Sequence, residues 1–382
     1  MGRDRGSGIT ARPVTVSICG DAGGAAALAP VLAMLEQERA VELVNYAYGV
    51  APSILARSAV PCISLDAGIG IPEAEERLRA SRARLLLTGT SVNETELEKP
   101  FIAAARHLGC RSVALLDFWS NYRRRFSDAS GHLSFVPDVI AVMDERAASD
   151  LRCAGIQADV CVTGQPAFDG LAKHRAQFAQ HTRASVRRTL GATDRDTLVL
   201  FFSQPLDEIY DKSRADHTLG FDQHDVLRLI IGTLKELPRS VSIKLAMRPH
   251  PRERRFHLEA ASEIDAIVDH TPNPWDSAMS SDLVTGMTSV ALLQASHLGC
   301  PVLSLQPGLV GEDMLPQAKG GSRASAYSRE AGVEMLRDLL TNASSRSELS
   351  QRALAAAVDT GATERVRDCV YQQLELTGNF SS

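Results

Sequence analysis

The residues that most clearly suggest chemistry are Arg248-Pro249-His250-Pro251, which follow the apolar segment 241–247. A proline on either side restricts the backbone of His250, so its imidazole is held in a defined direction. An imidazole beside an arginine suits the negative charge of a phosphate or diphosphate leaving group. We therefore expect Arg248 and His250 to contact phosphate, and His250 to assist the leaving group. The alternative is that His250 is an ordinary histidine of a surface loop.

A second candidate phosphate site lies in segment 282–305, where an apolar strand is expected to end at Gly286. Thr288 and Ser289 then open an apolar helix, and the first N–H groups of a helix have no partner within it. Two hydroxyls beside such N–H groups make a suitable cradle for phosphate. The alternative is that Thr288 is simply the N-cap of this helix, although capping and phosphate binding are compatible.

Polar residues also follow other strands predicted in this half of the chain. Ser203 and Gln204 come after the apolar run 197–202, and Pro205 ends that strand. These two residues either contact the same ligand or form a simple turn. Glu312, just after the segment "SLQPGLVG", is a candidate for binding a ribose hydroxyl, from its position alone.

The first predicted strand runs into the glycine-rich segment 20–30, "GDAGGAAALAP". Gly23 and Gly24 permit a tight turn and a close approach of the backbone to an acceptor, which makes both candidates for acceptor binding, and the following helix offers free N–H groups. The spacing is not that of the GxGxxG dinucleotide fingerprint. Asp21 is either the N-cap of this helix or a general base for an attacking hydroxyl.

Aromatic residues make up only 5% of the chain, yet several gather in "LLDFWSNYRRRF", residues 115–126. Ring faces pack on the C–H surfaces of sugars, while carboxylate and amide groups bind their hydroxyls. This mixture makes Asp117, Trp119 and Asn121 candidates for binding a sugar-like acceptor. The arginines, Arg125 among them, could hold a phosphate or carboxylate on that acceptor. The alternative is a helix edge with packed aromatic side chains.

The elements that must position these residues alternate between short apolar runs and helical patterns. Such alternation predicts parallel sheets covered by helices on both faces. We expect two Rossmann-like α/β domains that face each other across a cleft, with C-terminal helices packing back across the domains. The predicted boundaries are a disordered leader at 1–12, an N-terminal acceptor domain at 13–172, a helical linker at 173–196, a C-terminal nucleotide-donor domain at 197–345, and C-terminal helices at 346–382. Ligands of such sheets bind at the carboxyl ends of the strands.

Composition limits the possible classes of protein. The 382 residues carry a formal net charge of −5, which argues against a general nucleic-acid-binding surface. Seven scattered cysteines without CxxC spacing indicate reduced thiols in a cytoplasmic protein. The sequence has no run of 18 apolar residues, which predicts no membrane span and leaves peripheral membrane contact open. We also expect no metal site, because no HExxH or paired carboxylate motif follows a predicted strand.

The pairing of "RPHP" with "DLVTGMTSVALLQASHLGCPVLSL" resembles the donor-binding domain of GT-B-type glycosyltransferases. It is similar in particular to bacterial surface-polysaccharide enzymes, including CDP-glycerol glycerophosphotransferases and the sialyl- and polysialyltransferases that carry a His-Pro motif. The hydrolysing UDP-N-acetylglucosamine 2-epimerases share the same two-domain architecture. The resemblance implies a nucleotide-activated donor on the C-terminal domain, with His250, Thr288 and Ser289 at its phosphates. It also implies a metal-independent reaction and an acceptor on the N-terminal domain, with Asp21 as the candidate base.

The leading hypothesis is a transferase that moves a glycosyl or glycerophosphoryl-like group from a nucleotide donor to a hydroxyl acceptor, without a cofactor. One alternative is an isomerase of the UDP-sugar 2-epimerase type, which would need several acid and base groups such as Asp21 and Asp117. Another is a non-catalytic nucleotide-sugar-binding protein. A homodimer is compatible with each of these hypotheses.

Overall fold

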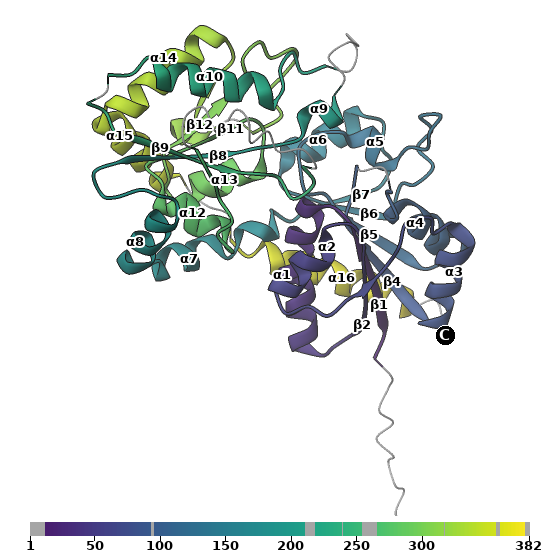
Figure 1. Cartoon of the computed structure of the whole chain (residues 1–382). Coiled ribbons are helices and arrows are strands. Elements are labelled where there is room, and N and C mark those ends of the chain that lie inside the picture. Colours follow the sequence, from purple (N-terminus) through teal and green to yellow (C-terminus); the bar gives the residue numbers. More distant parts are fainter. Residues whose placement is uncertain are drawn as a thin grey trace, which may run out of the picture. The chain divides into compact units, whose positions relative to one another are not determined.

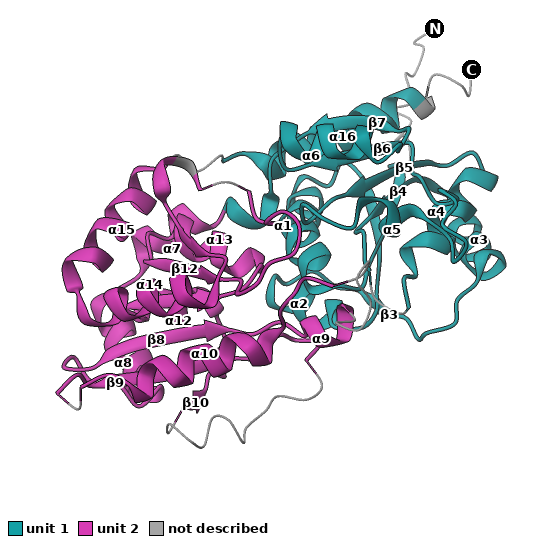
Figure 2. Cartoon of the chain, turned by 90° about the horizontal axis from the view of Figure 1, so that it is seen from above, with its two compact units in different colours: residues 1–169, 359–382 teal, residues 170–358 magenta. Residues whose placement is uncertain are grey.

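The computed structural model describes residues 12–92, 95–210, 218–238, 240–253, 266–316, 318–356 and 360–378. The leader predicted at 1–12 lies outside these residues except for residue 12, and so does segment 256–263, whose sequence "FHLEAASE" predicts a helix. The chain divides into two compact units, which are coloured separately in Figure 2. Unit 1 comprises residues 1–169 and 359–382, and unit 2 comprises residues 170–358.

Unit 1 is built on a parallel sheet whose described strands number seven, in the order β3-β2-β1-β4-β5-β6-β7. The labels of β2, β1, β4, β5, β6 and β7 follow this order in Figure 1. Strands such as β6, "VIAV", are buried at every residue, as expected for a sheet covered on both faces. The strands are β1 (Val14–Cys19), β2 (Glu42–Ala47), β3 (Ile63–Ser64), β4 (Ala83–Thr88), β5 (Arg111–Leu115), β6 (Val139–Val142) and β7 (Asp159–Val162).

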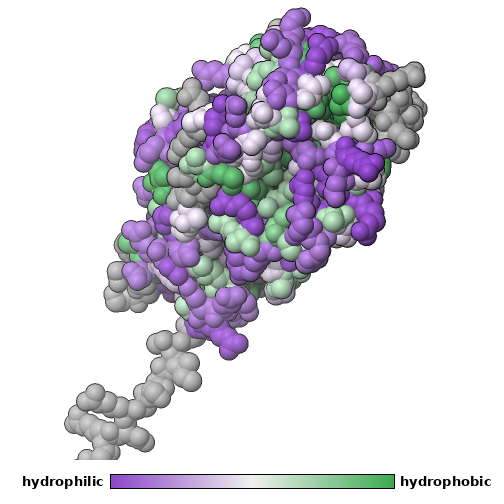
Figure 3. All heavy atoms as spheres, turned by 90° about the vertical axis from the view of Figure 1, so that its left-hand side faces the viewer, coloured by the Kyte–Doolittle hydropathy of each residue, from purple (hydrophilic) through white to green (hydrophobic). Residues whose placement is uncertain are grey.

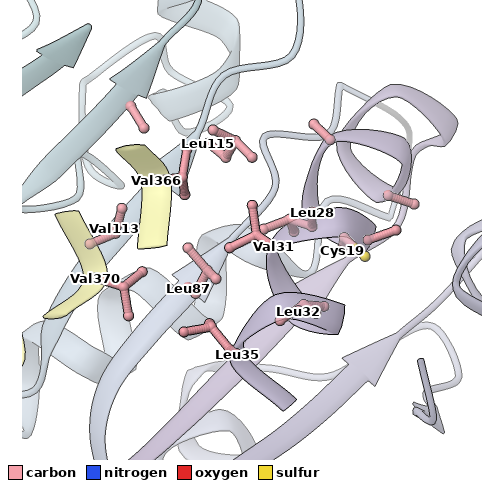
Figure 4. Packing of buried hydrophobic residues seen from close by; sticks show 14 of the residues in the cluster. Cys19, Leu28, Val31, Leu32, Leu35, Leu87, Val113, Leu115, Val366 and Val370 are labelled. Carbon is pink, nitrogen blue, oxygen red and sulfur yellow. The ribbon is translucent and has the colours of Figure 1, made fainter. Parts of the chain in front are cut away.

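Helices connect these strands, and the last described helix of the chain also belongs to this unit. They are α1 (Ala22–Glu38), α2 (Ala51–Arg57), α3 (Ile71–Ala80), α4 (Glu98–His107), α5 (Tyr122–Phe126), α6 (Glu145–Cys153), the short η1 (Pro166–Phe168) and α16 (Ala362–Gly378). Val366 and Val370 of α16 belong to the same buried cluster as Leu87 of β4 and Leu32 of α1 (Figure 4). The end of the chain therefore returns to the core of unit 1, as the prediction of C-terminal helices packing back implied.

Unit 2 has a parallel sheet of six described strands, in the order β10-β9-β8-β11-β12-β13. The strands are β8 (Thr197–Phe202), β9 (Ile243–Arg248), β10 (Ile267–Val268), β11 (Leu283–Gly286), β12 (Val302–Leu305) and β13 (Ala324–Ala326). Its helices are α7 (Leu171–Gln177), α8 (Gln180–Thr189), α9 (Leu206–Ile209), α10 (Gln223–Lys235), α12 (Pro274–Ser280), α13 (Val290–His297), η2 (Lys319–Gly321), α14 (Arg329–Thr341) and α15 (Ala343–Ala355).

Two helix starts of unit 2 show ordinary capping by side chains. Asp222 and Asp225 form a reciprocal capping box at the start of α10. Asn273 caps α12, whose first residue is Pro274. The buried side of α10 then packs with β8, β9 and α14 in the core of this unit.

The structure confirms the predicted fold class of two Rossmann-like parallel-sheet units. Two differences from the sequence-based prediction concern the C-terminal part of the chain. The sequence of residues 329–375 has a helical pattern throughout, but the structure divides it among α14, α15 and α16. The side chain of Asn342 accepts from Ser344 N and Ser345 N and so starts α15. The short strand β13 was not predicted, because "ASA" has neither the length nor the β-branched residues of a typical strand.

The surface mixes polar and apolar residues. On the face drawn in Figure 3, hydrophobic residues are interspersed among hydrophilic ones. The large hydrophobic side chains that stay exposed in the described residues come from separate elements and loops: Ile63, Val162, Val310, Tyr327, Leu354 and Leu376. Within the described part of the chain, no helix combines the length and the apolar character needed to cross a membrane.

Candidate functional site

The candidate phosphate-binding residues of unit 2 follow neighbouring strands. β9, β8, β11 and β12 are adjacent and parallel, so their carboxyl ends share one edge of the sheet. His250 follows β9, Ser203 and Gln204 follow β8, and Thr288 follows β11. The fold therefore brings to one edge the segments that the sequence singled out.

Glu253 connects the His250 turn to the end of β8. Its Oε1 accepts from Ser203 Oγ at 2.9 Å, and its Oε2 accepts from the backbone N–H of His250 at 3.1 Å. The backbone N–H of Glu253 in turn donates to the carbonyl oxygen of His250 at 2.9 Å. Burial raises the pKa of Glu253 above its usual value, although the hydrogen bonds from Ser203 and His250 lower it. The carboxyl group thus fixes the turn that carries the imidazole.

The imidazole of His250 is oriented from within the same turn. Its Nδ1 lies 3.2 Å from the backbone N–H of Arg252, which can only donate. Nδ1 is therefore the acceptor, and in the neutral ring the proton lies on Nε2. In this tautomer Nε2 is the hydrogen-bond donor of the ring.

Gln204 connects the end of β8 to the start of α13. Its Oε1 accepts from the backbone N–H of Thr288 at 2.9 Å and lies 3.5 Å from the hydroxyl of Thr288. Thr288 is buried, with 2% of its surface exposed. Ser203 and Gln204 are consecutive, so one short segment contacts both the His250 turn and the Thr288 segment.

The start of α13 is capped by Ser289 rather than by Thr288. Ser289 Oγ accepts from the backbone N–H of Ala291 at 3.1 Å. Gly286 has a packing role, since a Cβ built there would lie 2.9 Å from the carbonyl oxygen of Phe202. The missing side chain lets the ends of β8 and β11 approach closely, which places Gln204 beside Thr288. Direct contacts of Gly286 and Ser289 with a ligand stay predictions.

Arg248 binds the neighbouring strand end. Its Nη1 donates at 2.8 Å both to Asp269 Oδ2 and to the carbonyl oxygen of Thr271. The Asp269 side chain is fully buried. Burial raises its pKa, but the hydrogen bonds from Thr271 and Arg248 outweigh burial and lower the pKa of Asp269 overall. Arg248 therefore stabilises the loop after β10, and its predicted contact with phosphate is not needed to explain its position.

Glu312 lies exposed in the connection between β12 and β13, also beyond the carboxyl end of a strand. Its neighbour Asp313 accepts from the hydroxyl of Tyr327 at 3.0 Å and from the backbone N–H of Leu315 at 2.9 Å. The predicted contact of Glu312 with a ribose stays a prediction.

In unit 1, Asp21 occupies the N-cap position of α1 without capping it. Its Oδ2 instead accepts from the backbone N–H of Val92 at 3.0 Å, and its own N–H donates to Ser91 Oγ at 3.0 Å. The side chain is thus held at the carboxyl edge of the sheet, between the ends of β1 and β4. This location is compatible with the predicted role of Asp21 as a base. Because the carboxyl group bonds to Val92 instead, it does not cap α1.

Asp117 and Arg125 form a buried ion pair in unit 1, with Asp117 Oδ1 and Arg125 Nη1 2.7 Å apart. Arg125 Nη1 also donates to the carbonyl oxygen and the hydroxyl of Thr90. Asp117 Oδ2 lies over Gly23, where an added Cβ would come within 2.0 Å of it. Gly23 and Asp117, both predicted to bind the acceptor, therefore contact each other. Arg125 is 5% exposed, and its partners are protein groups.

The other predicted acceptor residues have local partners. Trp119 is buried, and its Nε1 donates to Asp144 Oδ2 at 2.9 Å. Asn121 has a left-handed backbone with φ of 59° and donates to Ser120 Oγ at 3.2 Å. Gly24 is buried in α1, where an added Cβ would lie 3.5 Å from the Cα of Gly89. Their predicted contacts with an acceptor stay predictions.

Unit 1 also has an open cavity of about 660 Å³ beside α5. Its lining includes Lys99, Arg123 and Arg124, together with the acidic residues Glu96 and Asp128. Lys99 pairs with Glu96 at 2.5 Å, and Arg123 donates to two backbone carbonyl groups. Two members of the "RRR" segment thus line this cavity, whereas Arg125 lies inside the unit.

The sequence analysis missed two carboxyl groups that the structure makes prominent, Glu98 and Glu253. Glu98, the first residue of α4, is 3% exposed and accepts from Gly20 N, Ser91 Oγ and the hydroxyl of Tyr48. Nothing in the acidic segment "NETELEKP" distinguishes Glu98 from the other glutamates of the same segment. Glu253 had a detectable signal, because it stands three residues after His250, the spacing of a turn.

The described residues contain no group of three or more His, Cys, Asp and Glu side chains arranged to hold a metal ion. What the two edges do offer is hydrogen-bond donors in unit 2 and carboxyl groups in unit 1. Donors suit the charge of a phosphate, and carboxyl groups suit hydroxyls and proton transfer.

No family model and no curated protein matches the sequence. Solved structures do resemble it. A putative UDP-N-acetylglucosamine 2-epimerase from Listeria monocytogenes has a TM-score of 0.70 at 17% identity, over 96% of this chain and 98% of that one. S. aureus MnaA, solved with UDP, has a TM-score of 0.69 at 16% identity, over 95% and 97%. Anabaena HepE, solved with UDP and glucose, has a TM-score of 0.64 at 13% identity, over 96% and 100%.

These likenesses extend over nearly the whole length of each chain and establish the fold. The chain has the GT-B-like fold of two parallel-sheet units, in agreement with the resemblance seen in its sequence. The narrower resemblance to the CDP-glycerol and His-Pro-motif families is not what the structural comparison finds, since several of the similar structures carry the name UDP-N-acetylglucosamine 2-epimerase and another is MurG.

Proposed function

We propose that this protein is an enzyme that acts on a nucleotide sugar, and that unit 2 binds the nucleotide through its phosphates. The observation that carries the proposal is the network from His250 through Glu253, Ser203 and Gln204 to Thr288 at one sheet edge. The solved structures with UDP or a UDP-sugar among those of similar fold support the choice of a nucleotide sugar.

The chemistry of this edge suits a diphosphate. The imidazole of His250 and the hydroxyl of Thr288 are the donors that we assign to the negatively charged oxygens. Preorganised donors of this kind stabilise charge that develops on a leaving phosphate. Because Glu253 and Gln204 fix these donors before a ligand binds, little reorganisation is required. The role of His250 and Thr288 as phosphate ligands is part of this proposal.

Isomerisation of the UDP-N-acetylglucosamine 2-epimerase type is the reaction we favour. Several structures of this fold carry that name. The reaction needs acid and base groups at the sugar, and unit 1 presents the carboxyl group of Asp21 at its sheet edge. Glycosyl transfer to a hydroxyl acceptor is the second candidate, supported by the "RPHP" segment and by the HepE structure with UDP and glucose.

Calorimetric titration with UDP and with UDP-, CMP-, CDP- and GDP-linked sugars tests the ligand. We expect one nucleotide class to bind and His250→Ala to lower its affinity by about 10-fold or more, equivalent to about 1.4 kcal/mol. His181→Ala, at an exposed histidine of α8, is the matched control and should leave affinity unchanged. Absence of binding by every nucleotide would overturn the proposal.

NMR analysis of the products separates the two reactions. Incubation with UDP-N-acetylglucosamine alone should give an isomerised sugar if the protein is an epimerase. A transferase should instead give a new glycosidic product only when an acceptor is added. An unchanged substrate in both incubations, despite binding, would leave the protein as a non-catalytic nucleotide-sugar-binding protein.

A further inference from the structure

A buried carboxyl group supports the turn that carries Asp21 in unit 1. The backbone N–H of Gly20 donates to Glu98 Oε1 at 3.1 Å, and Ser91 Oγ donates to the same oxygen at 2.5 Å. The hydroxyl of Tyr48 donates to Oε2. None of these three donors is a cation. The carboxyl group is therefore stabilised by neutral hydrogen bonds from three segments that are distant in the sequence.

Both hydroxyls also accept a hydrogen bond from the backbone. Ser91 Oγ accepts from Asp21 N at 3.0 Å, and the oxygen of Tyr48 accepts from Leu97 N at 3.1 Å. A backbone N–H can only donate, so each hydroxyl hydrogen is directed to Glu98. Glu98 thus holds two consecutive N–H groups of the β1–α1 turn, that of Gly20 directly and that of Asp21 through Ser91.

We propose that Glu98 is a positioning residue for the Gly20–Asp21 turn, and that it holds this turn only while its carboxyl group is ionised. A carboxylate accepts from all three donors. These three donors and the backbone N–H of Glu98 itself fill the roughly four acceptor positions of the carboxylate. A carboxylic acid has one acceptor position fewer, so protonation leaves one donor hydrogen without an acceptor. Proton uptake therefore loosens the turn. The consequence for catalysis rests on the proposed function, whereas the loosening itself does not.

The surroundings of Glu98 place the ionisation of its carboxyl group near neutral pH. The titratable groups that face it are Tyr48 from the end of β2, and Cys19 and Asp21 from the end of β1. Burial raises the pKa values of Tyr48 and Cys19, so both stay protonated. Burial also raises the pKa of Glu98 from 4.5 to about 7, with the charge of Asp21 adding to the rise, while the hydrogen bonds from Ser91 and Tyr48 lower it.

Hydrogen exchange followed by mass spectrometry on the ligand-free full chain tests the proposal. The readout is the protection of peptides covering residues 20 and 21, corrected for the pH dependence of intrinsic exchange. We expect wild-type protection to fall by about 10-fold between about pH 8 and about pH 6. Glu98→Gln, which cannot ionise, should show at both pH values the low protection expected for wild type at about pH 6. Glu96→Gln is the matched control, because Glu96 pairs with Lys99 and should behave as wild type.

A second variant separates positioning from folding. Ser91→Ala breaks only the relay to Asp21, so it should deprotect that amide and leave the Gly20 amide responsive to pH. Wild-type protection that does not depend on pH would overturn the proposal, and so would equal protection in Glu98→Gln and wild type. If Glu98→Gln does not fold, the wild-type pH series and Ser91→Ala decide the question. Nucleotide binding to unit 2, measured separately, shows whether the proposed function stands.

Discussion

The backbone N–H of Thr288 donates to the side-chain Oε1 of Gln204 across 2.9 Å, although 84 residues separate the two in the chain. Ser203, next to Gln204, binds Glu253 in the turn that carries His250. Two consecutive residues at the end of β8 therefore hold together the two segments that the sequence indicates as phosphate ligands. The hypothesis of a single phosphate site requires this proximity.

Replacing Gln204 by Met should weaken nucleotide binding. The substitution removes the acceptor of a buried N–H, a loss that costs about 1–3 kcal/mol, and it frees the start of α13 to move. We expect UDP affinity, measured by calorimetry, to fall by about 10-fold. Thr288→Val should lower it by a similar factor, since the hydroxyl is lost. Gln351→Met, on the exposed side of α15, is the control. Unchanged affinity in both site variants would show that α13 does not bind the phosphates.

The Ser203–Glu253 hydrogen bond should be coupled energetically to nucleotide binding. A double-mutant cycle with Ser203→Ala and Glu253→Gln isolates the interaction between the two side chains. Because the bond fixes the His250 turn, we expect a coupling of about 0.5–1.5 kcal/mol in the UDP binding free energy. Additive effects of the two substitutions would mean that the bond does not influence the imidazole.

Arg248→Met should destabilise unit 2. The substitution leaves the fully buried carboxyl group of Asp269 without its ion-pair partner, at a cost of about 3–5 kcal/mol in the free energy of unfolding. Adding Asp269→Asn should restore part of this stability, because the stranded charge is removed. Urea unfolding gives both values. UDP affinity that stays low in the stabilised double variant would assign Arg248 a ligand role as well.

The raised pKa of Glu98 predicts how stability depends on pH. Its pKa rises from 4.5 to about 7 on folding, so the folded protein binds the proton more tightly than the unfolded chain. The resulting contribution of Glu98 to the free energy of unfolding is complete below about pH 4.5 and is lost as the pH rises through about 7. At about 1.4 kcal/mol per pKa unit, the loss is about 3 kcal/mol. Urea unfolding from about pH 5 to about pH 8 should show this decline in wild type and in Glu96→Gln, but not in Glu98→Gln.

The fold was predictable because its signals are local. Apolar runs such as "VIAV" and "VLSL", separated by helical patterns, determine buried parallel strands wherever they occur in the chain. The turn residues after the strands could be placed at the sheet edge for the same reason. The break at Asn342 was less visible, since both flanking segments have helical patterns and only the capping side chain separates them.

The partners of the site residues could not be predicted from the sequence. Arg248, expected at a phosphate, is engaged by Asp269, and Arg125, expected at an acceptor, is engaged by Asp117. Asp117 and Arg125 lie in the same connection after β5 and pair through its local fold, whereas the Arg248–Asp269 pair depends on which strand lies beside which, and the sheet order is not contained in a local pattern. Glu98 was missed for the same reason, because its burial arises from contacts with residues 78, 50 and 7 positions away.

Alanine substitutions at the adjacent glycines of α1 should act in opposite directions. Both Gly23 and Gly24 lie inside this helix, where alanine is favoured over glycine by up to about 1 kcal/mol. At Gly24 the new Cβ would meet its nearest atom at 3.5 Å, an ordinary contact, so Gly24→Ala should be neutral or stabilising. At Gly23 the Cβ would lie 2.0 Å from Asp117 Oδ2, so the carboxylate must leave its place. Because that carboxylate pairs with buried Arg125, we expect Gly23→Ala to lower the urea midpoint of unit 1 and Gly24→Ala to keep or raise it. Equal midpoints for the two variants would show that Asp117 moves aside without cost and that Gly23 is not needed for packing.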